Sequence, residues 1–390
     1  MEWRYANTVL VLCLLAYLAI RIAQLIISPV IPALIGEFEV SRAAVGFALT
    51  GMWGVYAFSQ LPSGVLADHY GERRVVLVAL ALAGVAITTA AGAPAFPVFF
   101  GCVLLLGVGA GLYYNAATAL LTRLHEEIGR AVGIHRIGSQ LAGLLAPAIA
   151  AVLIGYGWRP TLVVGGVVSF VVLLGFLWRV RPTDPVNPDV RIRETVSIGL
   201  LLRLLREPPI AFATSVAILG EFAILTTMSF LPTFLVQYHG YSLAFAGILF
   251  SGYFAIVAIG QPASGWLSDR IGRDPVLGIA FLAGMTGYFG LVMGITSLVV
   301  IAPSVALVGV GMSWGSPLQS RVMDSLDDAD RGVGFGLVRT LYILVGAAGN
   351  TVVGALADLW GWGTGFGVLG VLVGIAAGLI LFNRLFRLGW

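Results

Sequence analysis

The feature that most constrains this chain is a series of roughly a dozen apolar runs separated by short polar breaks. A bilayer core requires about 20 apolar residues per spanning helix, and these runs have that length. Hydrophobic residues make up 59% of the 390 positions and charged residues 11%, which is too apolar for a chain whose surface faces water. We therefore predict an all-α polytopic membrane protein with twelve transmembrane helices in two pseudosymmetric six-helix bundles. The helices are expected at residues 8–34, 44–67, 75–94, 96–121, 132–156, 160–178, 210–236, 243–267, 275–296, 298–321, 333–357 and 363–383.

The distribution of arginine predicts the topology. All 22 basic residues are arginine; with the N-terminus placed inside, 17 of them fall in cytoplasmic segments and only Arg42 and Arg159 on the opposite side. The positive-inside rule then places both termini in the cytoplasm, and we expect a multi-pass protein surrounded by the lipid bilayer of the plasma membrane. The other three, Arg21, Arg136 and Arg339, lie within apolar runs.

Several classes of function are excluded by what the sequence lacks. It contains no lysine, so it has no Walker A phosphate-binding loop, and its arginines follow the loops of a membrane topology rather than a nucleic-acid-binding patch. Cys13, Cys102 and the four histidines show no metal-ligand spacing, so we expect no metal, no cofactor and no disulfide. Residues 311–315 match the nucleophile-elbow pattern, but no histidine is predicted at the depth of Ser313. The chain is not expected to be an enzyme.

The two halves of the chain repeat one plan at a spacing of 201 residues. The segment SGVLADHYG that begins at Ser63 aligns with SGWLSDRIG that begins at Ser264. An even number of helices per half makes the repeats parallel, as expected for a transporter of six plus six helices. We predict an N-terminal six-helix bundle over residues 1–178, a cytoplasmic linker over 179–209 and a C-terminal six-helix bundle over 210–390.

The repeated segment resembles motif A of the major facilitator superfamily, and with the helix count and duplication the resemblance covers essentially the whole chain. It implies a secondary active transporter in which two bundles rock about a site near the midplane, while motif A latches the cytoplasmic side. The first copy departs from the motif at His69 and Glu72, where a basic residue is usual, which predicts a weaker or pH-sensitive first latch. The gating residues carried over from the motif are Gly64, Asp68, Gly71 and Arg73 in the first copy and Gly265, Asp269, Gly272 and Arg273 in the second.

Two ion pairs between the bundles are implied by the family's helix packing. Because the second helix packs on the eleventh and the eighth on the fifth in family members, we predict latches between Asp68 and Arg339 and between Asp269 and Arg136. The alternative is that both arginines only extend to the cytoplasmic headgroups.

One arginine lies too deep in the membrane to reach water. Arg21 is about 13 residues from either end of the first run, roughly 20 Å from each surface. A charge at that depth is costly and usually faces a partner or a cavity. Tyr17 and Gln24 share its helical face. We predict that Arg21 binds an anionic substrate through its planar guanidinium, with Tyr17 and Gln24 beside it.

Glu221 lies at the corresponding depth of the seventh helix. We predict that it contacts the substrate and binds a coupling proton; the alternative is a permanent ion pair with Arg21 that only holds the halves together. Further substrate-binding candidates are polar and aromatic residues at repeat-equivalent positions, and packing is the alternative role for each. They are Tyr113, Tyr114, Asn115, Trp314 and Gln319.

The transport mode is inferred from these charges. Drug/proton antiporters of the family usually have an arginine and a Gly-Pro pair where this chain has Val103 and Ala146-Pro147. We therefore predict import of a small organic or inorganic anion by proton symport. The transporter is expected to be a monomer. Two alternatives stay open: proton-coupled efflux of drugs or amphipathic metabolites, and a non-transporting receptor on a transporter scaffold.

Overall fold

A computed structural model describes residues 2–187, 198–327 and 331–388, and every regular element in these ranges is helical. The all-α prediction is confirmed. The elements are α1 (Glu2–Leu25), α2 (Ile27–Phe38), α3 (Arg42–Tyr70), α4 (Glu72–Ala91), α5 (Phe96–Leu124), α6 (Ile128–Leu153), η1 (Ile154–Tyr156), α7 (Trp158–Arg179), α8 (Ile198–Leu204), α9 (Pro208–Gln237), α10 (Leu243–Ile271), α11 (Arg273–Val292), α12 (Leu298–Gly311), η3 (Met312–Trp314), α13 (Gly315–Asp324), α14 (Arg331–Trp360) and α15 (Trp362–Leu385).

Within the described residues, 11 helical segments are long and apolar enough to cross a membrane. They include Arg4–Phe38, which joins α1 and α2, and Leu298–Asp324, which joins α12 and α13. The remaining expected span is α3, whose 29 residues extend about 43 Å at 1.5 Å per residue, more than the bilayer core requires. Polar side chains such as Thr50 and Gln60 lower its hydropathy. With α3 included, the architecture fits twelve spans.

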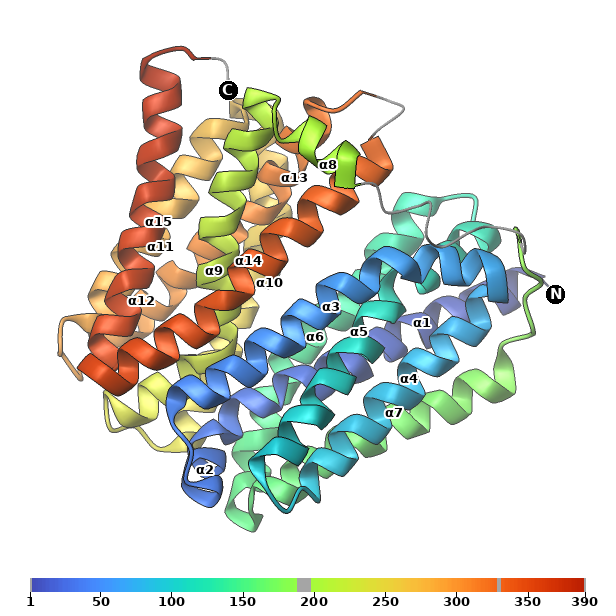
Figure 1. Ribbon diagram of the computed structural model, residues 1–390, viewed down its shortest axis with the longest axis horizontal. Helices are drawn as coiled ribbons and strands as arrows, with labels where there is room; N and C mark the ends of the chain where they lie inside the picture. The colour runs from blue at the N-terminus through green and yellow to red at the C-terminus, as the bar shows by residue number, and fades with distance from the viewer. Residues whose placement is uncertain (1, 188–197, 328–330, 389–390) are drawn as a thin grey trace. The chain divides into compact units, whose positions relative to one another are not determined.

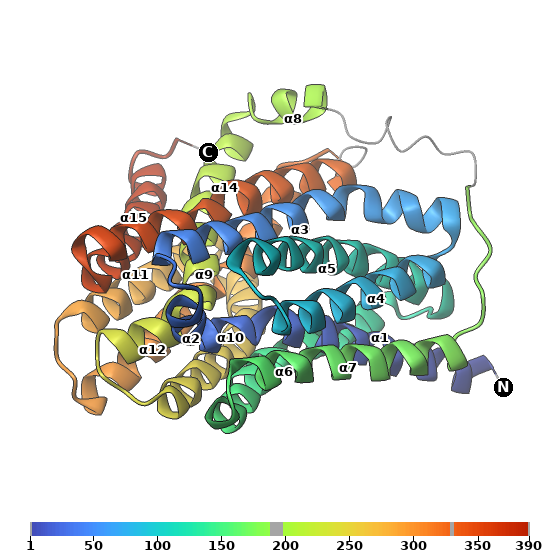
Figure 2. The same cartoon turned by 60° about the horizontal axis from the view of Figure 1, so that its bottom comes forward.

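The chain divides into two compact units. The N-terminal unit contains residues 1–40 and 51–196, and the C-terminal unit contains 41–50 and 197–390. In the first, α4 packs against α5 and α7, and α1 packs against α6 and α7 (Figures 1 and 2). In the second, α11 packs against α12 and α15, and α9 packs against α14 (Figure 1). Residues 188–197 of the predicted linker lie outside the described ranges.

The first ten residues of the α3 region belong to the C-terminal unit because α14 caps the start of this helix. The Asp358 carboxylate accepts the backbone N–H groups of Arg42 at 3.1 Å and Ala43 at 2.9 Å. These N–H groups have no partner inside their own helix, and the helix N-terminus favours a negative charge. About two turns further along α3, the Thr50 hydroxyl donates to the carbonyl oxygen of Ala347 at 2.8 Å. The boundary between the units therefore passes through α3.

Two predicted helices are interrupted, in each case near a proline. The first run was expected to be continuous over 8–34, but α1 ends at Leu25 and α2 begins at Ile27. Pro29 has no N–H to donate to the Leu25 carbonyl, and its ring clashes with that group in a regular helix. The predicted helix over 298–321 is likewise divided by a 3₁₀ turn, Met312–Trp314.

Pro317 accounts for that second interruption. It cannot donate to the carbonyl oxygen of Ser313, which instead accepts the hydroxyl of Ser264 at 2.7 Å. The same contact recurs 201 residues earlier, where the Ser63 hydroxyl donates to the carbonyl oxygen of Leu112 at 2.5 Å. The sequence repeat is therefore also a repeat of helix-to-helix hydrogen bonds.

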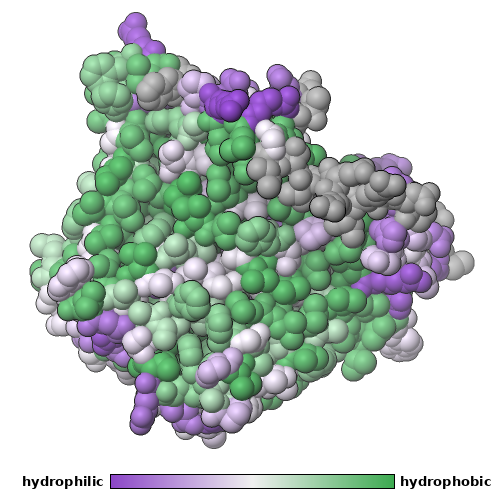
Figure 3. All heavy atoms as spheres, in the orientation of Figure 1, coloured by the Kyte–Doolittle hydropathy of each residue, from purple (hydrophilic) through white to green (hydrophobic). Residues whose placement is uncertain are grey.

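The helix flanks expose large apolar side chains. More than two thirds of the surface is accessible in each of five such residues: Val152, Trp178, Ile259, Val299 and Leu359. In Figure 3 apolar residues predominate along the helix flanks of each unit, and hydrophilic ones gather near the helix ends. Such surfaces are stable in lipid, where every backbone polar group is satisfied inside its own helix.

Candidate functional site

Arg21 lies in a compact polar cluster of the N-terminal unit. Its Nη1 donates to Oε1 of Gln24, one turn further along α1, at 2.9 Å. Its guanidinium carbon lies 5.2 Å from the centroid of the Trp53 ring on α3, within range of a cation–π interaction. Gln24 is 3% exposed and Trp53 4%, so protein encloses two sides of the charge. We call Arg21, Gln24 and Trp53 the donor cluster.

The donor cluster has more hydrogen-bond donors than acceptors. Arg21 Nε, Gln24 Nε2 and Trp53 Nε1 are all buried and have no hydrogen-bond partner among the described residues. No carboxylate in the described part of the N-terminal unit forms an ion pair with Arg21. Buried unsatisfied donors destabilise a protein, so a ligand oxygen that accepts them is strongly favoured. Trp53 was not predicted; an aromatic N–H donor in the middle of the second run was the available signal.

Tyr17 belongs to a second cluster, made with α5 and α6. Its ring centroid lies 5.6 Å from that of Tyr113, 5.7 Å from Tyr114 and 5.0 Å from His135. Tyr113 is fully buried, and its hydroxyl contacts both the carbonyl oxygen of Cys13 and Nε2 of His135, the latter at 3.0 Å. His135 was not among the site residues predicted from the sequence. We call Tyr17, Tyr113, Tyr114 and His135 the aromatic cluster.

Asn115 makes a contact between helices. Its Nδ2 donates to the backbone carbonyl oxygen of Gln60 at 2.8 Å, which ties α5 to α3. The amide oxygen of Asn115 remains able to accept a further hydrogen bond. Substrate binding by Asn115 stays a prediction.

In the C-terminal unit, the predicted residues lie on α9, η3 and α13. Glu221 is half-buried, and a Cβ placed on Gly346 of α14 would lie 2.8 Å from its Cβ, so the two helices are in close contact there. Trp314 is 2% exposed and fills the space that a side chain at Gly220 would need. Gln319 is half-buried on α13. The roles proposed for these residues in substrate binding remain predictions.

The first copy of motif A is held by the segment that follows α7. The carbonyl oxygen of Asp68 accepts the backbone N–H groups of Val186 at 2.9 Å and Asn187 at 3.1 Å. The backbone N–H of Arg73 donates to the hydroxyl oxygen of Thr183 at 3.1 Å. The start of the predicted linker therefore packs against motif A of its own unit.

The motif's last glycine is required by backbone geometry. Gly71 has φ +86° and Gly272 has φ +96°, a conformation that other residues rarely adopt. A Cβ on Gly71 would also lie 2.3 Å from the carbonyl oxygen of Thr183. Gly64 has open space around it, and Gly265 faces Ser316 at 3.4 Å. The glycines that turn the chain between α3 and α4 and between α10 and α11 have a clear structural role.

Glu72 explains why this copy departs from the usual motif. It is 1% exposed, and Arg123 Nη1 donates to both of its carboxylate oxygens at 2.8 and 2.9 Å. The same Nη1 donates to the carbonyl oxygen of Asp184 at 3.2 Å. Glu72 therefore forms an ion pair between α4 and α5 in which the carboxylate is buried and the Arg123 side chain is 42% exposed. This pairing was not predicted from the sequence.

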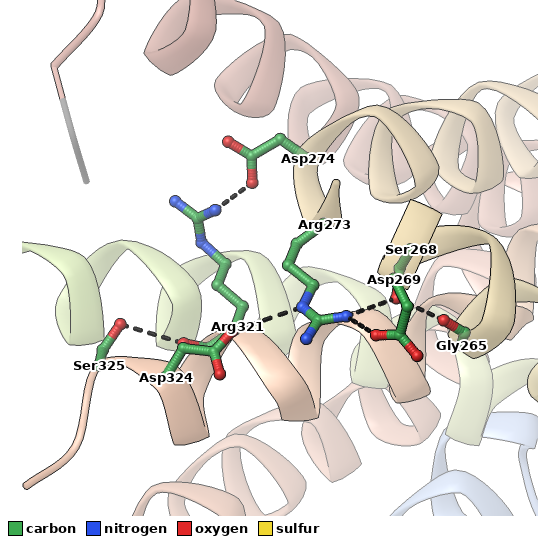
Figure 4. A network of polar contacts seen from close by, with 8 residues as sticks. All are labelled: Gly265, Ser268, Asp269, Arg273, Asp274, Arg321, Asp324 and Ser325. Atoms are coloured by element: carbon green, nitrogen blue, oxygen red, sulfur yellow. Dashed lines mark hydrogen bonds and ion pairs between the residues drawn. The ribbon is translucent and has the colours of Figure 1, made fainter. Parts of the chain in front are cut away.

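The second copy uses a network of charges on α10, α11 and α13 (Figure 4). Arg273 contacts Asp269 and donates from Nε to Asp324 at 3.4 Å, while Arg321 contacts Asp274. Arg273 and Asp324 stand 201 residues after Glu72 and Arg123. The two halves thus place an ion pair at equivalent positions with the charges exchanged.

The predicted latches concern residues of different units. Asp269 is bonded to Arg273 within its own unit, and Arg136 is exposed on α6. Asp68 is half-buried, and its carboxylate makes no hydrogen bond or ion pair with the described residues of its unit. The Asp68–Arg339 and Asp269–Arg136 pairs stay predictions.

The family is established by comparison with known proteins. The model of the Major Facilitator Superfamily matches residues 13–320 and 226–387, which together cover nearly the whole chain. This chain belongs to the major facilitator superfamily, and it is a membrane transporter rather than an enzyme.

Relatives and solved structures agree with the family. The chain is 24% identical to the probable sulfoacetate transporter SauU of Cupriavidus necator, over 95% of this chain and 92% of the relative. It is 24% identical to the 4-hydroxybenzoate transporter PcaK of Pseudomonas aeruginosa, over 79% and 75%. A bacterial homologue of the human lysosomal transporter Spinster, in an inward-facing and unoccupied conformation, has a TM-score of 0.83 at 16% identity, over 97% and 96% of the two chains. The last comparison supports the fold alone.

Proposed function

We propose that this transporter imports a small organic or inorganic anion by alternating access and that proton symport drives the import. The observation that carries the proposal is the donor cluster. It presents three buried nitrogen donors that have no acceptor among the described residues, and one of them belongs to the charged Arg21 guanidinium. Such a site stabilises a carboxylate, sulfonate or phosphate oxygen and repels a cation.

The geometry of the donor cluster supports recognition of an oxyanion. Gln24 accepts a hydrogen bond from one nitrogen of the Arg21 guanidinium and restricts its orientation, while Nε has no hydrogen-bond partner in the described part of the chain. The guanidinium fork matches the two oxygens of a carboxylate or related anion, and in a site away from water that interaction is stronger than at a surface. The Trp53 ring covers one face of the charge and adds an N–H donor of its own.

The named substrates of the relatives support the same class. Sulfoacetate and 4-hydroxybenzoate both carry a carboxylate, and the two transporters named for them match most of this chain. Either anion presents oxygens that could accept the donors of Arg21, Gln24 and Trp53.

Glu221 is the proposed proton-binding group of the C-terminal unit. It is a half-buried acidic side chain inside α9, the repeat counterpart of α1. An ionised carboxylate inside a membrane span is costly unless it is paired or protonated. A cycle in which Glu221 gains and loses a proton would therefore couple import to the proton gradient.

The remaining elements of the proposal concern location and gating. We place the protein in the plasma membrane as a monomer. Both termini lie in the cytoplasm in this proposal, because the arginines favour one side of the membrane. Asp68 with Arg339 and Asp269 with Arg136 would form the latches that open and close during the cycle. The Asp68 carboxylate makes no hydrogen bond or ion pair with the described residues of its own unit, which supports the first of these latches.

The proposal is tested by ligand-induced thermal stabilisation of the purified protein. The panel contains sulfoacetate, 4-hydroxybenzoate, phosphate, nitrate and a lipophilic cationic drug. Arg21→Ala removes the proposed anion contact, and Arg159→Ala is the matched control because Arg159 pairs with Glu37 at 2.9 Å away from the donor cluster. A ligand at 100 times its dissociation constant adds about 2.7 kcal/mol to the free energy of unfolding.

We expect at least one anion to stabilise the wild type and Arg159→Ala but not Arg21→Ala. Stabilisation by the cationic drug alone would favour proton-coupled efflux instead. An anion that binds but is not moved across proteoliposomes would favour the receptor alternative. An anion response in Arg21→Ala equal to the wild type would contradict the assignment of Arg21.

A further inference from the structure

The aromatic cluster contains a titratable group that the proposed transport cycle has not used. His135 is 0% exposed on α6, between helices α1 and α5. Its Nδ1 is buried and has no hydrogen-bond partner among the described residues. A buried ring nitrogen without a partner is unusual, because most buried polar atoms are satisfied.

The hydrogen bonds around Tyr113 fix which nitrogen of the ring can receive a proton. The Tyr113 hydroxyl has one hydrogen and two neighbours, the carbonyl oxygen of Cys13 and Nε2 of His135. A carbonyl can only accept, so the tyrosine hydrogen points to Cys13 and Nε2–H of His135 donates to the tyrosine oxygen. The neutral imidazole then has its lone pair on Nδ1.

Two aromatic faces make this ring position suitable for a transient positive charge. The imidazole stacks on Tyr17 with centroids 5.0 Å apart and planes at 27°, and on Tyr114 at 5.7 Å and 24°. Tyrosine faces attract a cation within about 6 Å. Tyr17 and Tyr114 are only half-buried, whereas Tyr113 is fully buried. The cluster therefore has a closed side at Tyr113 and a more open side at the two flanking rings.

Close helix packing joins His135 to the proposed anion site. A Cβ on Gly138, one turn after His135, would lie 2.2 Å from the carbonyl oxygen of Leu14 on α1, so α6 and α1 touch there. Tyr17, which stacks on His135, precedes Arg21 by four residues on the same helix, a rise of about 6 Å. An anion bound at Arg21 would bring negative charge close to the imidazole and favour its protonation.

The other charged and titratable groups around His135 are few. On α1 they are Cys13, Tyr17 and Arg21, and on α5 they are Tyr113 and Tyr114. Arg136 adjoins His135 on α6 and is exposed, and Arg130 on the same helix pairs with Glu127 at 3.1 Å. From α2 and α7, which also pack on α6, Glu37 and Arg159 are paired with each other, and Arg179 stacks on Trp178. Among the described residues no carboxylate contacts the His135 ring.

We infer that His135 is a proton-binding site of the transport cycle, taking up at Nδ1 a proton that travels with the anion bound at the donor cluster. This inference rests on the proposed anion–proton symport and adds a site in the N-terminal unit to Glu221 in the C-terminal one. No bond other than Nδ1–H forms, and the proton is released unchanged when the anion leaves.

The test is the number of protons coupled to one anion in proteoliposomes. The probe is radiolabelled sulfoacetate, or the panel anion that stabilises the wild type, and the membrane potential is clamped to zero. At steady state each coupled proton multiplies the accumulation ratio about tenfold per pH unit of gradient, since one pH unit corresponds to about 1.4 kcal/mol. His135→Gln keeps a polar side chain that can contact Tyr113 but cannot bind a proton.

We expect His135→Gln to lower the accumulation ratio about tenfold per pH unit of gradient relative to the wild type. A wild-type dependence of accumulation on the pH gradient in correctly folded His135→Gln would overturn the inference. Should His135→Gln fail to fold, Tyr113→Phe decides: a shifted pH midpoint of gradient-driven uptake supports the inference and an unchanged midpoint contradicts it. A wild type that moves no anion of the panel would instead refute the proposed function, and the inference with it.

Discussion

The junction between α3 and α4 and the junction between α10 and α11 carry the same motif, but the ion pairs beside them have their charges exchanged. In the N-terminal unit an acidic Glu72 receives a basic Arg123, whereas in the C-terminal unit a basic Arg273 donates to an acidic Asp324. The first pair is closer, 2.8 against 3.4 Å, and its acidic member is 1% exposed against 64%. The comparison teaches that the repeat retains the position of an ion pair, not the identity of its members.

The largest expected effect comes from removing one partner of each pair. Arg123→Ala leaves the Glu72 carboxylate buried without its cation, and we expect the free energy of unfolding to fall by about 3 kcal/mol. Asp324→Ala removes an exposed partner at a longer distance, so we expect a fall of less than about 1 kcal/mol. Thermal unfolding in detergent measures both; equal losses would contradict the difference in burial.

The two turn glycines provide a second comparison. Gly71→Ala and Gly272→Ala both force a side chain into a positive φ, which costs about 1–3 kcal/mol. Only at Gly71 does the new Cβ also meet a backbone oxygen, that of Thr183 at 2.3 Å, so we expect Gly71→Ala to lose at least about 1 kcal/mol more. The difference in melting temperature between the two variants checks this, and a larger loss at Gly272 would refute it.

Exchanging the charges of Glu72 and Arg123 tests whether this ion pair forms with either order of charges at the two positions. Glu72→Arg combined with Arg123→Asp reproduces the charge order of Arg273 and Asp324. Contacting residues couple by about 0.5–3 kcal/mol, so we expect the double variant to be at least about 1 kcal/mol more stable than the sum of the single variants predicts. A double-variant cycle of thermal unfolding gives this coupling; strict additivity would mean that the pair depends on the original side chains.

The smallest expected effect is a pH dependence of stability that arises from His239, at one end of the C-terminal unit. Burial lowers the pKa of His239 from 6.5, although a hydrogen bond from the ring to the Leu291 carbonyl at 2.9 Å acts in the opposite direction. The unfolded chain therefore binds a proton more readily, so stability is greatest above pH 6.5 and falls as the pH drops towards the folded-state pKa. The matching end of the N-terminal unit has Phe38 packed on Trp158, which does not titrate. His239→Gln should remove this part of the acid sensitivity; an unchanged pH profile of melting temperature would exclude it.

Much of the fold was predictable from the sequence, because apolar runs, the placement of arginine and a repeat at a constant spacing of 201 residues each indicate membrane helices. The break at Ile26 was missed because Pro29 acts on a carbonyl four residues earlier, inside a run that is apolar throughout. Glu72 was read as a departure from a motif, because its partner Arg123 lies one helix further along the chain.

The candidate site was only partly predictable for a similar reason. Arg21, Tyr17 and Gln24 share one helix, so their spacing predicted a common face. Trp53 and His135 come from other helices, and only packing brings their rings against Arg21 and Tyr17. The spacing of residues along one helix does not predict which residues of a distant helix will contact it.

The most direct test of the central claim is exchange of labelled sulfoacetate, 4-hydroxybenzoate and phosphate across proteoliposomes by the wild type, Arg21→Lys and the control Arg159→Lys. Lysine keeps the positive charge but loses the guanidinium fork and the Nε donor. If the donor cluster binds the transported anion, the wild type and Arg159→Lys exchange at least one of these anions, and Arg21→Lys is slower by at least about tenfold. Wild-type exchange by Arg21→Lys, or competition by lipophilic cations and not by anions, would contradict the account.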